Sequence, residues 1–105
     1  MRVREFSDLE INVDEYGFLL YPEEWNERIA IELAYKEGIK YLTGQHWLVI
    51  RFIRDFNNVN GHPPTIMKIC SETLMSLKKI YELFPTGPAK GACKIAGVKK
   101  PVGCI

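Results

Sequence analysis

The sequence predicts a small α+β domain: a short N-terminal antiparallel β meander packed on a bundle of about five helices, followed by a flexible C-terminal arm. The chain has 105 residues, of which 47% are hydrophobic. This is enough for one domain to bury a core without metal or disulfide staples. Near the N-terminus, apolar and polar residues alternate with a period of two, and further along the chain the apolar residues have helical spacing. Proline and glycine residues separate these segments.

The N-terminal segment alternates between apolar and polar residues from Leu9 to Asp14. Such a pattern is typical of a strand with one buried face. Residues 14–17 (DEYG) indicate a turn before the apolar residues 18–20. We therefore expect a small hairpin or meander in this region.

Two longer helices should follow. Pro22 at a first helical position, two glutamates in the first turn and Gly38 past the end predict a helix over roughly 22–37. Thr43 is a suitable N-cap for a second helix over roughly 44–58. Its apolar residues cover most of the circumference, which predicts the central helix of the core.

Three shorter helices complete the predicted bundle. Apolar residues with helical spacing indicate helices over 64–71 and 73–84, after a loop rich in asparagine. The last helix should run from Pro88 to Gly97. One of its faces has only small residues and can pack closely on the body; they are Ala89, Ala92, Cys93 and Ala96.

Residues 98–105 have no periodicity, which predicts a mobile terminus. We therefore expect one domain over residues 1–97 and a C-terminal arm over residues 98–105, with Cys93 and Cys104 as the cysteines of a redox arm. Residues 87–105 contain four lysines and no acidic residue, which leaves 10 basic and 13 acidic side chains in residues 1–86. The four lysines are Lys90, Lys94, Lys99 and Lys100.

The amino terminus has no leader in which basic residues are followed by apolar ones. The longest strongly apolar run is residues 47–50. This is far shorter than the roughly 20 residues that span a bilayer. We expect a soluble, cytoplasmic protein. Three cysteines are too few for a secreted disulfide scaffold, so a bridge that forms in a reducing cytosol indicates catalytic or carrier chemistry.

Cys93 and Cys104 are the candidate redox pair. Cys104 is the penultimate residue and should be the accessible thiol, on an arm whose eight residues after Gly97 extend to about 26 Å. The ten intervening residues can bring the two Cα atoms within the roughly 4.4–6.8 Å that a disulfide needs. The spacing leaves a second interpretation open, in which Cys104 has no role and Cys93 is a helix-packing residue.

The remaining cysteine and the histidines favour packing roles. We expect Cys70 in the core, His46 as a hydrogen-bonded residue at the start of a core helix, and His62 in a loop. Their spacing does not match zinc-ligand patterns, so no metal site is expected.

The chain resembles a known family. Residues 83–90 (LFPTGPAK) followed by residues 91–105 (GACKIAGVKKPVGCI) are similar to the DsrC/TusE family, which includes the gamma subunit of dissimilatory sulfite reductase. The similarity extends upstream through DEYGFL at 14–19, Trp25, EGI at 37–39, LT at 42–43, HWLVI at 46–50 and Arg54.

This resemblance implies a sulfur carrier and co-substrate of dissimilatory sulfite reductase that is not catalytic alone. The family's two arm cysteines fall on Cys104 and Cys93. Cys104 would enter the siroheme site of the reductase alpha and beta subunits, accept sulfur derived from sulfite, and close with Cys93 into a trisulfide or disulfide. A membrane-bound complex would reduce the trisulfide. Siroheme and iron–sulfur clusters would belong to the partner, and this chain would bind no cofactor.

The arm lysines Lys90, Lys94, Lys99 and Lys100 suit anionic sulfur species and an acidic docking surface. With Arg54, they are the candidate substrate- or partner-binding residues.

Two other functions are considered. A TusE-like persulfide relay for tRNA thiolation would use Cys104 alone, with sulfurtransferases as partners. A helix-turn-helix DNA-binding regulator could be built from the predicted helices at 44–58, 64–71 and 73–84. A net charge of +1 makes DNA an unlikely partner, because nucleic-acid binding needs a concentrated basic face.

Overall fold

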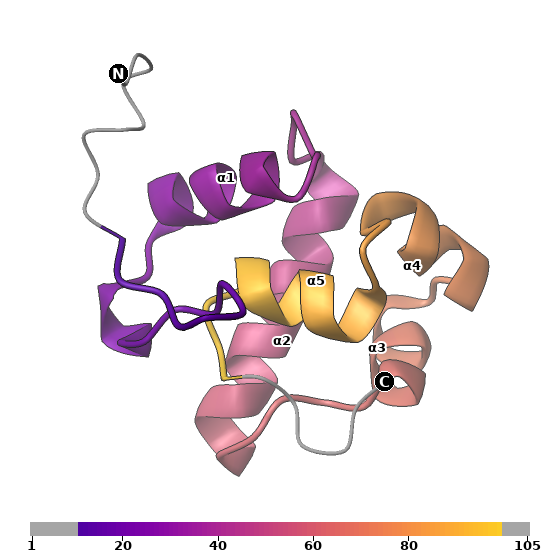
Figure 1. Ribbon diagram of the computed structural model, residues 1–105. Coiled ribbons are helices and arrows are strands. Elements are labelled where there is room, and N and C mark those ends of the chain that lie inside the picture. Colours follow the sequence, from indigo (N-terminus) through magenta and orange to yellow (C-terminus); the bar gives the residue numbers. More distant parts are fainter. Residues whose placement is uncertain (1–10, 100–105) are drawn as a thin grey trace.

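The computed structural model describes residues 11–99, which fold into five α-helices around a common core (Figure 1). The helices are α1 (Glu27–Lys36), α2 (Gly44–Asn60), α3 (Ile66–Thr73), α4 (Leu77–Leu83) and α5 (Pro88–Ile95). A short 3-10 helix, η2 (Pro22–Glu24), precedes α1.

The predicted N-terminal β meander, and with it the α+β class, is wrong for the part of the chain that the structure describes. Residues 11–20 contain no strand, and one isolated antiparallel bridge joins Val13 to Leu19. The pairing goes no further because η2 begins at Pro22, whose nitrogen has no hydrogen to donate to a ladder. Residues 11–99 are therefore helical.

The turn predicted at residues 14–17 is present and is closed by Asp14. The Asp14 carboxylate accepts hydrogen bonds from the backbone N–H groups of Tyr16 (2.8 Å) and Phe18 (3.0 Å), and its own N–H donates to the Phe18 carbonyl (2.8 Å). An aspartate that accepts from its own following backbone stabilises a tight turn without a sheet. Gly17 completes the turn with φ of 91°.

The helix predicted over 22–37 is interrupted. Asn26 is extended (φ −151°, ψ 179°), and its side chain accepts a hydrogen bond from the Ile29 N–H (2.9 Å) as the N-cap of α1. A side-chain oxygen at this position satisfies a donor that would otherwise be unpaired, so the α-helix starts here and not at Pro22. Its end agrees with the prediction, because α1 ends at Lys36, just before Gly38 with φ of 88°.

The predicted N-cap of the second helix is confirmed. Thr43 caps α2 by accepting from the His46 N–H (3.4 Å), while His46 Nδ1 accepts from the Thr43 N–H (3.0 Å). On the other side of the ring, Nε2 lies 2.8 Å from the Leu83 carbonyl oxygen. The neutral imidazole with its proton on Nε2 satisfies both contacts. The hydrogen-bonded packing role predicted for His46 is confirmed.

The helix predicted over 73–84 begins later than expected. Leu74 is left-handed (φ 58°, ψ 37°) and ends α3, with its N–H bonded to the Cys70 carbonyl. Ser76 then caps α4 by accepting from the Lys79 N–H (3.1 Å). Leucine rarely takes a left-handed conformation, so a leucine at this position does not predict the break.

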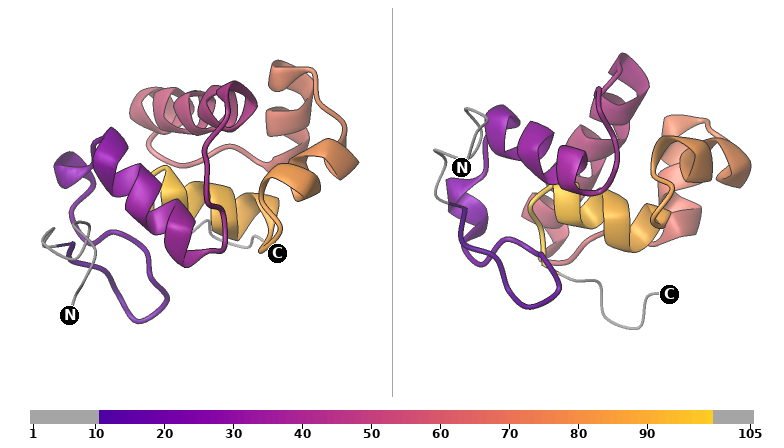
Figure 2. Two further views of the ribbon diagram at one scale, coloured as in Figure 1. Left: turned by 90° about the horizontal axis from the view of Figure 1, so that it is seen from above. Right: turned by 45° about the horizontal axis from the view of Figure 1, so that its top comes forward.

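Helix α5 lies in the middle of the bundle. It packs on α1, α2 and α4, and both views in Figure 2 place it between α1 and α4. The predicted small-residue face is confirmed where its side chains are described: Ala92, Cys93 and Ala96 are fully buried. Burial extends past the helix to Val98, which is 2% exposed. The core therefore fixes α5 and the first residue after Gly97.

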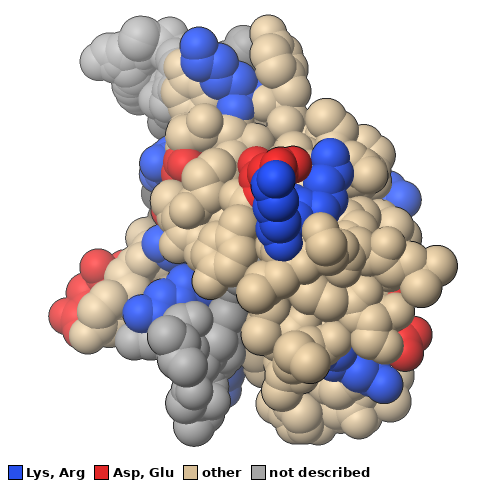
Figure 3. Space-filling model, turned by 90° about the vertical axis from the view of Figure 1, so that its right-hand side faces the viewer, with Lys and Arg blue, Asp and Glu red and all other residues tan. Residues whose placement is uncertain are grey.

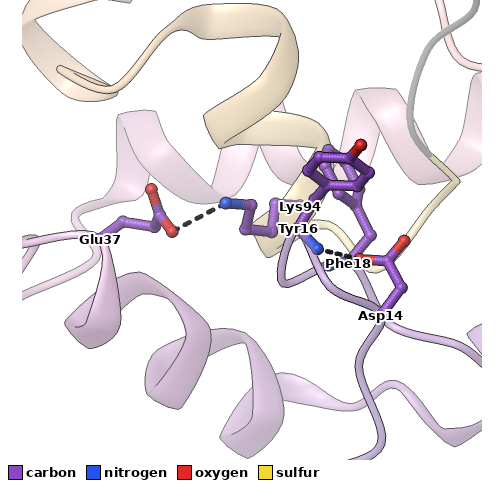
Figure 4. A network of polar contacts seen from close by, with 5 residues as sticks. All are labelled: Asp14, Tyr16, Phe18, Glu37 and Lys94. Carbon is purple, nitrogen blue, oxygen red and sulfur yellow. Dashed lines mark hydrogen bonds and ion pairs between the residues drawn. The ribbon is translucent and has the colours of Figure 1, made fainter.

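Lys94 ties α5 to two distant segments (Figure 4). Its Nζ lies 3.1 Å from Glu37 Oε2, just past the end of α1, and both side chains are mostly buried, at 18% and 16% exposed. The same Nζ lies 5.5 Å from the centroid of the Phe18 ring in the Asp14 turn. A charge paired in this way supports a packed contact more than an exposed ion pair does.

No helix within residues 11–99 is long and apolar enough to cross a membrane; the longest, α2, has 17 residues.

We predict that the free energy of unfolding falls between about pH 7.5 and about pH 5.5, with His46 responsible for much of the fall. Burial lowers the pKa of His46 from its usual 6.5; the Leu83 hydrogen bond opposes this and Lys79 adds to it. The unfolded chain thus takes up a proton that the folded chain resists. The contribution of His46 to the free energy of unfolding is therefore fully present well above pH 6.5, the usual pKa of the unfolded chain. It is lost as the pH falls through that value.

Urea denaturation at the two pH values measures this effect. His46→Gln should lower the free energy of unfolding by about 1–3 kcal/mol at the higher pH, because it removes the Leu83 contact, and should reduce the pH dependence. The control is His62→Gln, which changes an exposed loop histidine and should keep the wild-type pH dependence. Equal pH dependence in His46→Gln and wild type would contradict the assignment.

We also predict a coupling free energy of about 1 kcal/mol between Lys94 and Glu37, measured by urea denaturation of Lys94→Met, Glu37→Gln and the double variant. The pair is mostly buried, so each charge depends on the other. The matched control is Arg51 with Glu27, a pair 64% and 63% exposed at 3.3 Å, whose coupling should be below about 0.5 kcal/mol. Equal couplings in the two cycles would show that Lys94 does not anchor α5.

Candidate functional site

The candidate site is built on α5, which carries Cys93 in its second half. The Cys93 side chain is 0% exposed, among the aliphatic residues of the core. Cys104, its predicted partner, lies outside the described residues. A thiol buried in this way is protected from oxidants in solution.

The end of α5 is held by backbone hydrogen bonds that fix where the chain leaves the helix. The Gly97 N–H donates to the Lys94 carbonyl (3.1 Å), and the Val98 N–H donates to the Cys93 carbonyl (3.2 Å). Gly97 takes the left-handed conformation, with φ of 73°. This closure resembles a Schellman motif and reverses the chain direction next to Cys93.

Two side chains from other elements complete this end of α5. The Trp25 indole Nε1–H donates to the Ile95 carbonyl (2.9 Å), and Arg54 Nη1 from α2 donates to the Ala96 carbonyl (2.7 Å). The Arg54 guanidinium also stacks on the indole, with Cζ 4.0 Å from the ring centroid. We call this pair the Trp25–Arg54 clamp. It satisfies helix carbonyls that have no partner within the helix.

The clamp depends on glycine at position 97. A Cβ atom added to Gly97 would lie 2.3 Å from Trp25 Cδ1 and 2.8 Å from Cγ. Real Cβ atoms do not approach so closely, and the left-handed backbone adds strain for any other residue. The glycine therefore lets the indole lie against the exit of the arm.

Arg54 is partly buried by this packing. Burial lowers the pKa of its guanidinium from the usual value, while the neighbouring Asp55 carboxylate raises it. An arginine remains protonated in proteins even so. Its positive charge at the C-terminal end of α5 is also favourable for the helix dipole.

The other end of α5 borders a pocket. The pocket has a volume of about 280 Å³ and is lined by Tyr81, Pro85, Thr86, Gly87 and Lys90. The surface on this side of the molecule, over α3 and α4, is mainly uncharged, with both basic and acidic side chains scattered over it (Figure 3). Lys90 is exposed at the pocket.

The predicted binding residues thus lie in different surroundings. Arg54 and Lys94 flank the buried half of α5, where each contacts protein groups: the Ala96 carbonyl and the Glu37 carboxylate. Lys90, in the first turn of α5, and Lys99, four residues after the helix ends, are exposed. Lys100 lies outside the described residues.

Sequence reasoning missed two residues that position the site. Trp25 was noted only among the residues that carry the resemblance, whereas its indole N–H caps α5 across 70 residues of sequence. Glu37 was not singled out, although it pairs with Lys94 across 57 residues. Both belong to the segments that carried the family resemblance, which was the available signal.

Within residues 11–99, no group of three His, Cys, Asp or Glu residues is arranged to hold a metal ion. Cys70 is half-buried and packs at the edge of the core, and His62 is exposed. In this part of the chain, the chemistry available at α5 is that of the Cys93 thiol.

Comparison with known proteins identifies similar chains. The family model for DsrC-like protein matches residues 5–105. The gamma subunit of dissimilatory-type sulfite reductase from Nitratidesulfovibrio vulgaris is 42% identical over 93 residues, which is 89% of each chain. The sulfurtransferase TusE of Escherichia coli is 40% identical over 107 aligned positions, 95% of this chain and 97% of TusE.

A chain in the crystal structure of dissimilatory sulfite reductase I (DsrI) has the same fold, with a TM-score of 0.88 and 40% identity over 99% of this chain and 100% of that chain. The family match covers nearly all of the sequence, and the relatives exceed the identity at which homology is secure. The resemblance noted in the sequence is confirmed: the chain belongs to the family of DsrC-like proteins.

Proposed function

We propose that this chain is a sulfur carrier and protein co-substrate of a dissimilatory sulfite reductase. One observation carries the proposal: a chain of the DsrC-like family has two cysteines near its end, with Cys93 buried in α5 and Cys104 eleven positions later. A reactive thiol on the arm and a protected thiol on the body are the two parts that a carrier needs.

The proposed reaction begins with the Cys104 thiolate, which attacks sulfur that the reductase has partly reduced from sulfite. The Cys93 thiol then bonds to the same sulfur atom, so that a trisulfide joins the two cysteines. The reductase supplies two electrons and the two thiols supply two more, while the three sulfite oxygens leave as water. Four further electrons, from a membrane-bound complex, release sulfide and restore both thiols.

The partners proposed for this cycle are the alpha and beta subunits of the reductase, which would hold the siroheme and iron–sulfur clusters. The similar chain from Nitratidesulfovibrio vulgaris is a gamma subunit of such an enzyme, which supports the assignment. The exposed Lys90 and Lys99 would contribute to docking on an acidic surface, because Lys94 and Arg54 are occupied by contacts within the domain.

A persulfide relay is the second candidate. The identity to the sulfurtransferase TusE, 40%, is nearly the same as that to the sulfite reductase subunit, 42%. In a relay, Cys104 alone would pass sulfane sulfur from one sulfurtransferase to the next. Cys93 distinguishes the two functions, because only the carrier cycle consumes its thiol.

We predict that the chain recovered after turnover with a dissimilatory sulfite reductase and sulfite carries one additional sulfur atom that bridges Cys93 and Cys104. Intact mass spectrometry with thiol alkylation measures this species, in which both thiols are blocked. Cys104→Ala should abolish it. Cys93→Ala should leave no trisulfide and should reduce sulfide output by at least about tenfold, because the resolving step is lost.

Cys70→Ala is the matched control, since it removes a cysteine outside the arm, and its trisulfide yield should equal that of wild type. Sulfur on Cys104 with unchanged output in Cys93→Ala would identify the persulfide relay. Absence of added sulfur on Cys104 in the wild-type chain would refute the carrier function.

A further inference from the structure

In the proposed cycle, Cys93 must bond to a sulfur atom that arrives from outside the core, yet its side chain is 0% exposed. The residues that follow it are buried as well: Ile95 and Ala96 are 0% exposed, and Val98 is 2% exposed. A reagent reaches a side chain in a packed core only when the structure around it opens. The reaction of Cys93 therefore requires a movement, and the contacts around the last turn of α5 decide which part of the chain moves.

Residues 93–98, the last turn of α5 and its continuation, are closed on themselves by the backbone hydrogen bonds of Gly97 and Val98. Side-chain hydrogen bonds attach this segment to other elements: Trp25 to the Ile95 carbonyl (2.9 Å), Arg54 to the Ala96 carbonyl (2.7 Å) and Lys94 to Glu37 (3.1 Å). A short segment held by a few contacts is the kind of unit that opens locally while the rest of a protein stays folded.

The Trp25–Arg54 clamp supplies two of these contacts and couples them to each other. The guanidinium of Arg54 stacks on the indole of Trp25, with Cζ 4.0 Å from the ring centroid, so each side chain holds the other against α5. Both acceptors are carbonyls at the end of the helix, which have no partner within the helix. Opening residues 93–98 therefore has to break both bonds of the clamp.

We propose that Trp25 and Arg54 are positioning residues for the reaction of Cys93. While the clamp is closed, the last turn of α5 stays packed and the thiol is protected. When the clamp opens, the turn moves away from the body and admits sulfur to Cys93. In this role both side chains act through the backbone of α5, not on the sulfur atom. The inference deepens the proposed function, on which it rests, because it assigns a control to the second thiol of the carrier cycle.

The test is the rate at which iodoacetamide alkylates Cys93 in the folded chain, with Cys70→Ala and Cys104→Ala throughout so that one thiol remains. The thiolate forms a carbon–sulfur bond and iodide leaves, while the thiol proton passes to the buffer. Intact mass spectrometry follows the product, and the same chain unfolded in urea gives the rate of the accessible thiol. In the folded reference chain, alkylation should be at least about 100-fold slower than in the unfolded chain.

The clamp variants should react faster than the reference chain. Trp25→Phe keeps an aromatic ring beside Gly97 and removes the donor to Ile95, so the rate should rise about three- to tenfold, the value of one hydrogen bond. Arg54→Met should raise the rate about ten- to hundredfold, because a charged donor is lost. Arg54→Lys, which restores the charge, should recover part of the difference.

Two controls separate local opening from a general loss of stability. His46→Gln removes a hydrogen bond between α2 and the end of α4, so it lowers the free energy of unfolding without touching the clamp. Arg51→Met removes another arginine of α2, one whose ion-pair partner, Glu27, lies in α1. Both should leave the alkylation rate within about twofold of the reference.

Three outcomes would overturn the proposal. A rate that rises as much in His46→Gln as in Arg54→Met would show that Cys93 is reached by global unfolding. Unchanged rates in both Trp25→Phe and Arg54→Met would show that the clamp does not control access. A reference rate equal to that of the unfolded chain would show that the thiol needs no opening.

Hydrogen exchange of the Trp25 indole N–H measures the opening of the clamp without a thiol reagent, because this proton is bonded to the Ile95 carbonyl. Arg54→Met should accelerate its exchange by the same factor as the alkylation of Cys93, and should leave the Phe84 backbone amide, bonded to Ile80, unchanged. Unequal factors would contradict a common opening. No reductase takes part in either measurement, so loss of sulfur transfer with these results intact would refute the proposed function alone.

Discussion

The capping of helix α5 by the Trp25–Arg54 clamp is the contact on which the rest of the site depends. A helix of eight residues has little stability of its own, and the hydrogen bonds from Trp25 and Arg54 satisfy carbonyls that α5 cannot satisfy internally. Because the indole lies where a Cβ atom of any other residue at position 97 would be, the clamp also dictates glycine there. The direction in which the arm leaves the domain follows from these contacts.

Positive charges near Cys93 divide into two groups with different physical roles. Lys94 and Arg54 are partly buried, and each is committed to an acceptor within the protein, at 3.1 Å and 2.7 Å. Moving such a charge to an incoming anion would leave Glu37 or the Ala96 carbonyl unpaired, at a cost of about 1–3 kcal/mol each. Lys90 and Lys99 are exposed and free of that cost, so they are the cations from which ligand binding is best argued.

The amino-acid sequence predicted those elements that are determined by residues close to one another in the chain. Thr43 as a cap, Gly38 and Gly97 as helix ends and the small face of α5 were all found, because each depends on residues within one or two turns. The prediction of a meander was wrong because alternation of apolar and polar residues over six positions does not specify a partner strand, and Pro22 ends the pairing. The Asn26 break, the left-handed Leu74 and the Lys94–Glu37 contact were missed because tertiary packing decides them.

Family membership does not distinguish a carrier from a relay, because relatives of both kinds are about equally similar over most of the chain. The cysteines are the residues that can distinguish them. The burial of Cys93 is informative here. A thiol in a fully packed core is a poor first nucleophile, since solvent-borne sulfur species cannot reach it. The same burial suits a second nucleophile that must stay reduced until sulfur arrives on its own chain. The clamp packs against Gly97, four residues after Cys93, so it fixes where the backbone leaves the helix that carries this thiol.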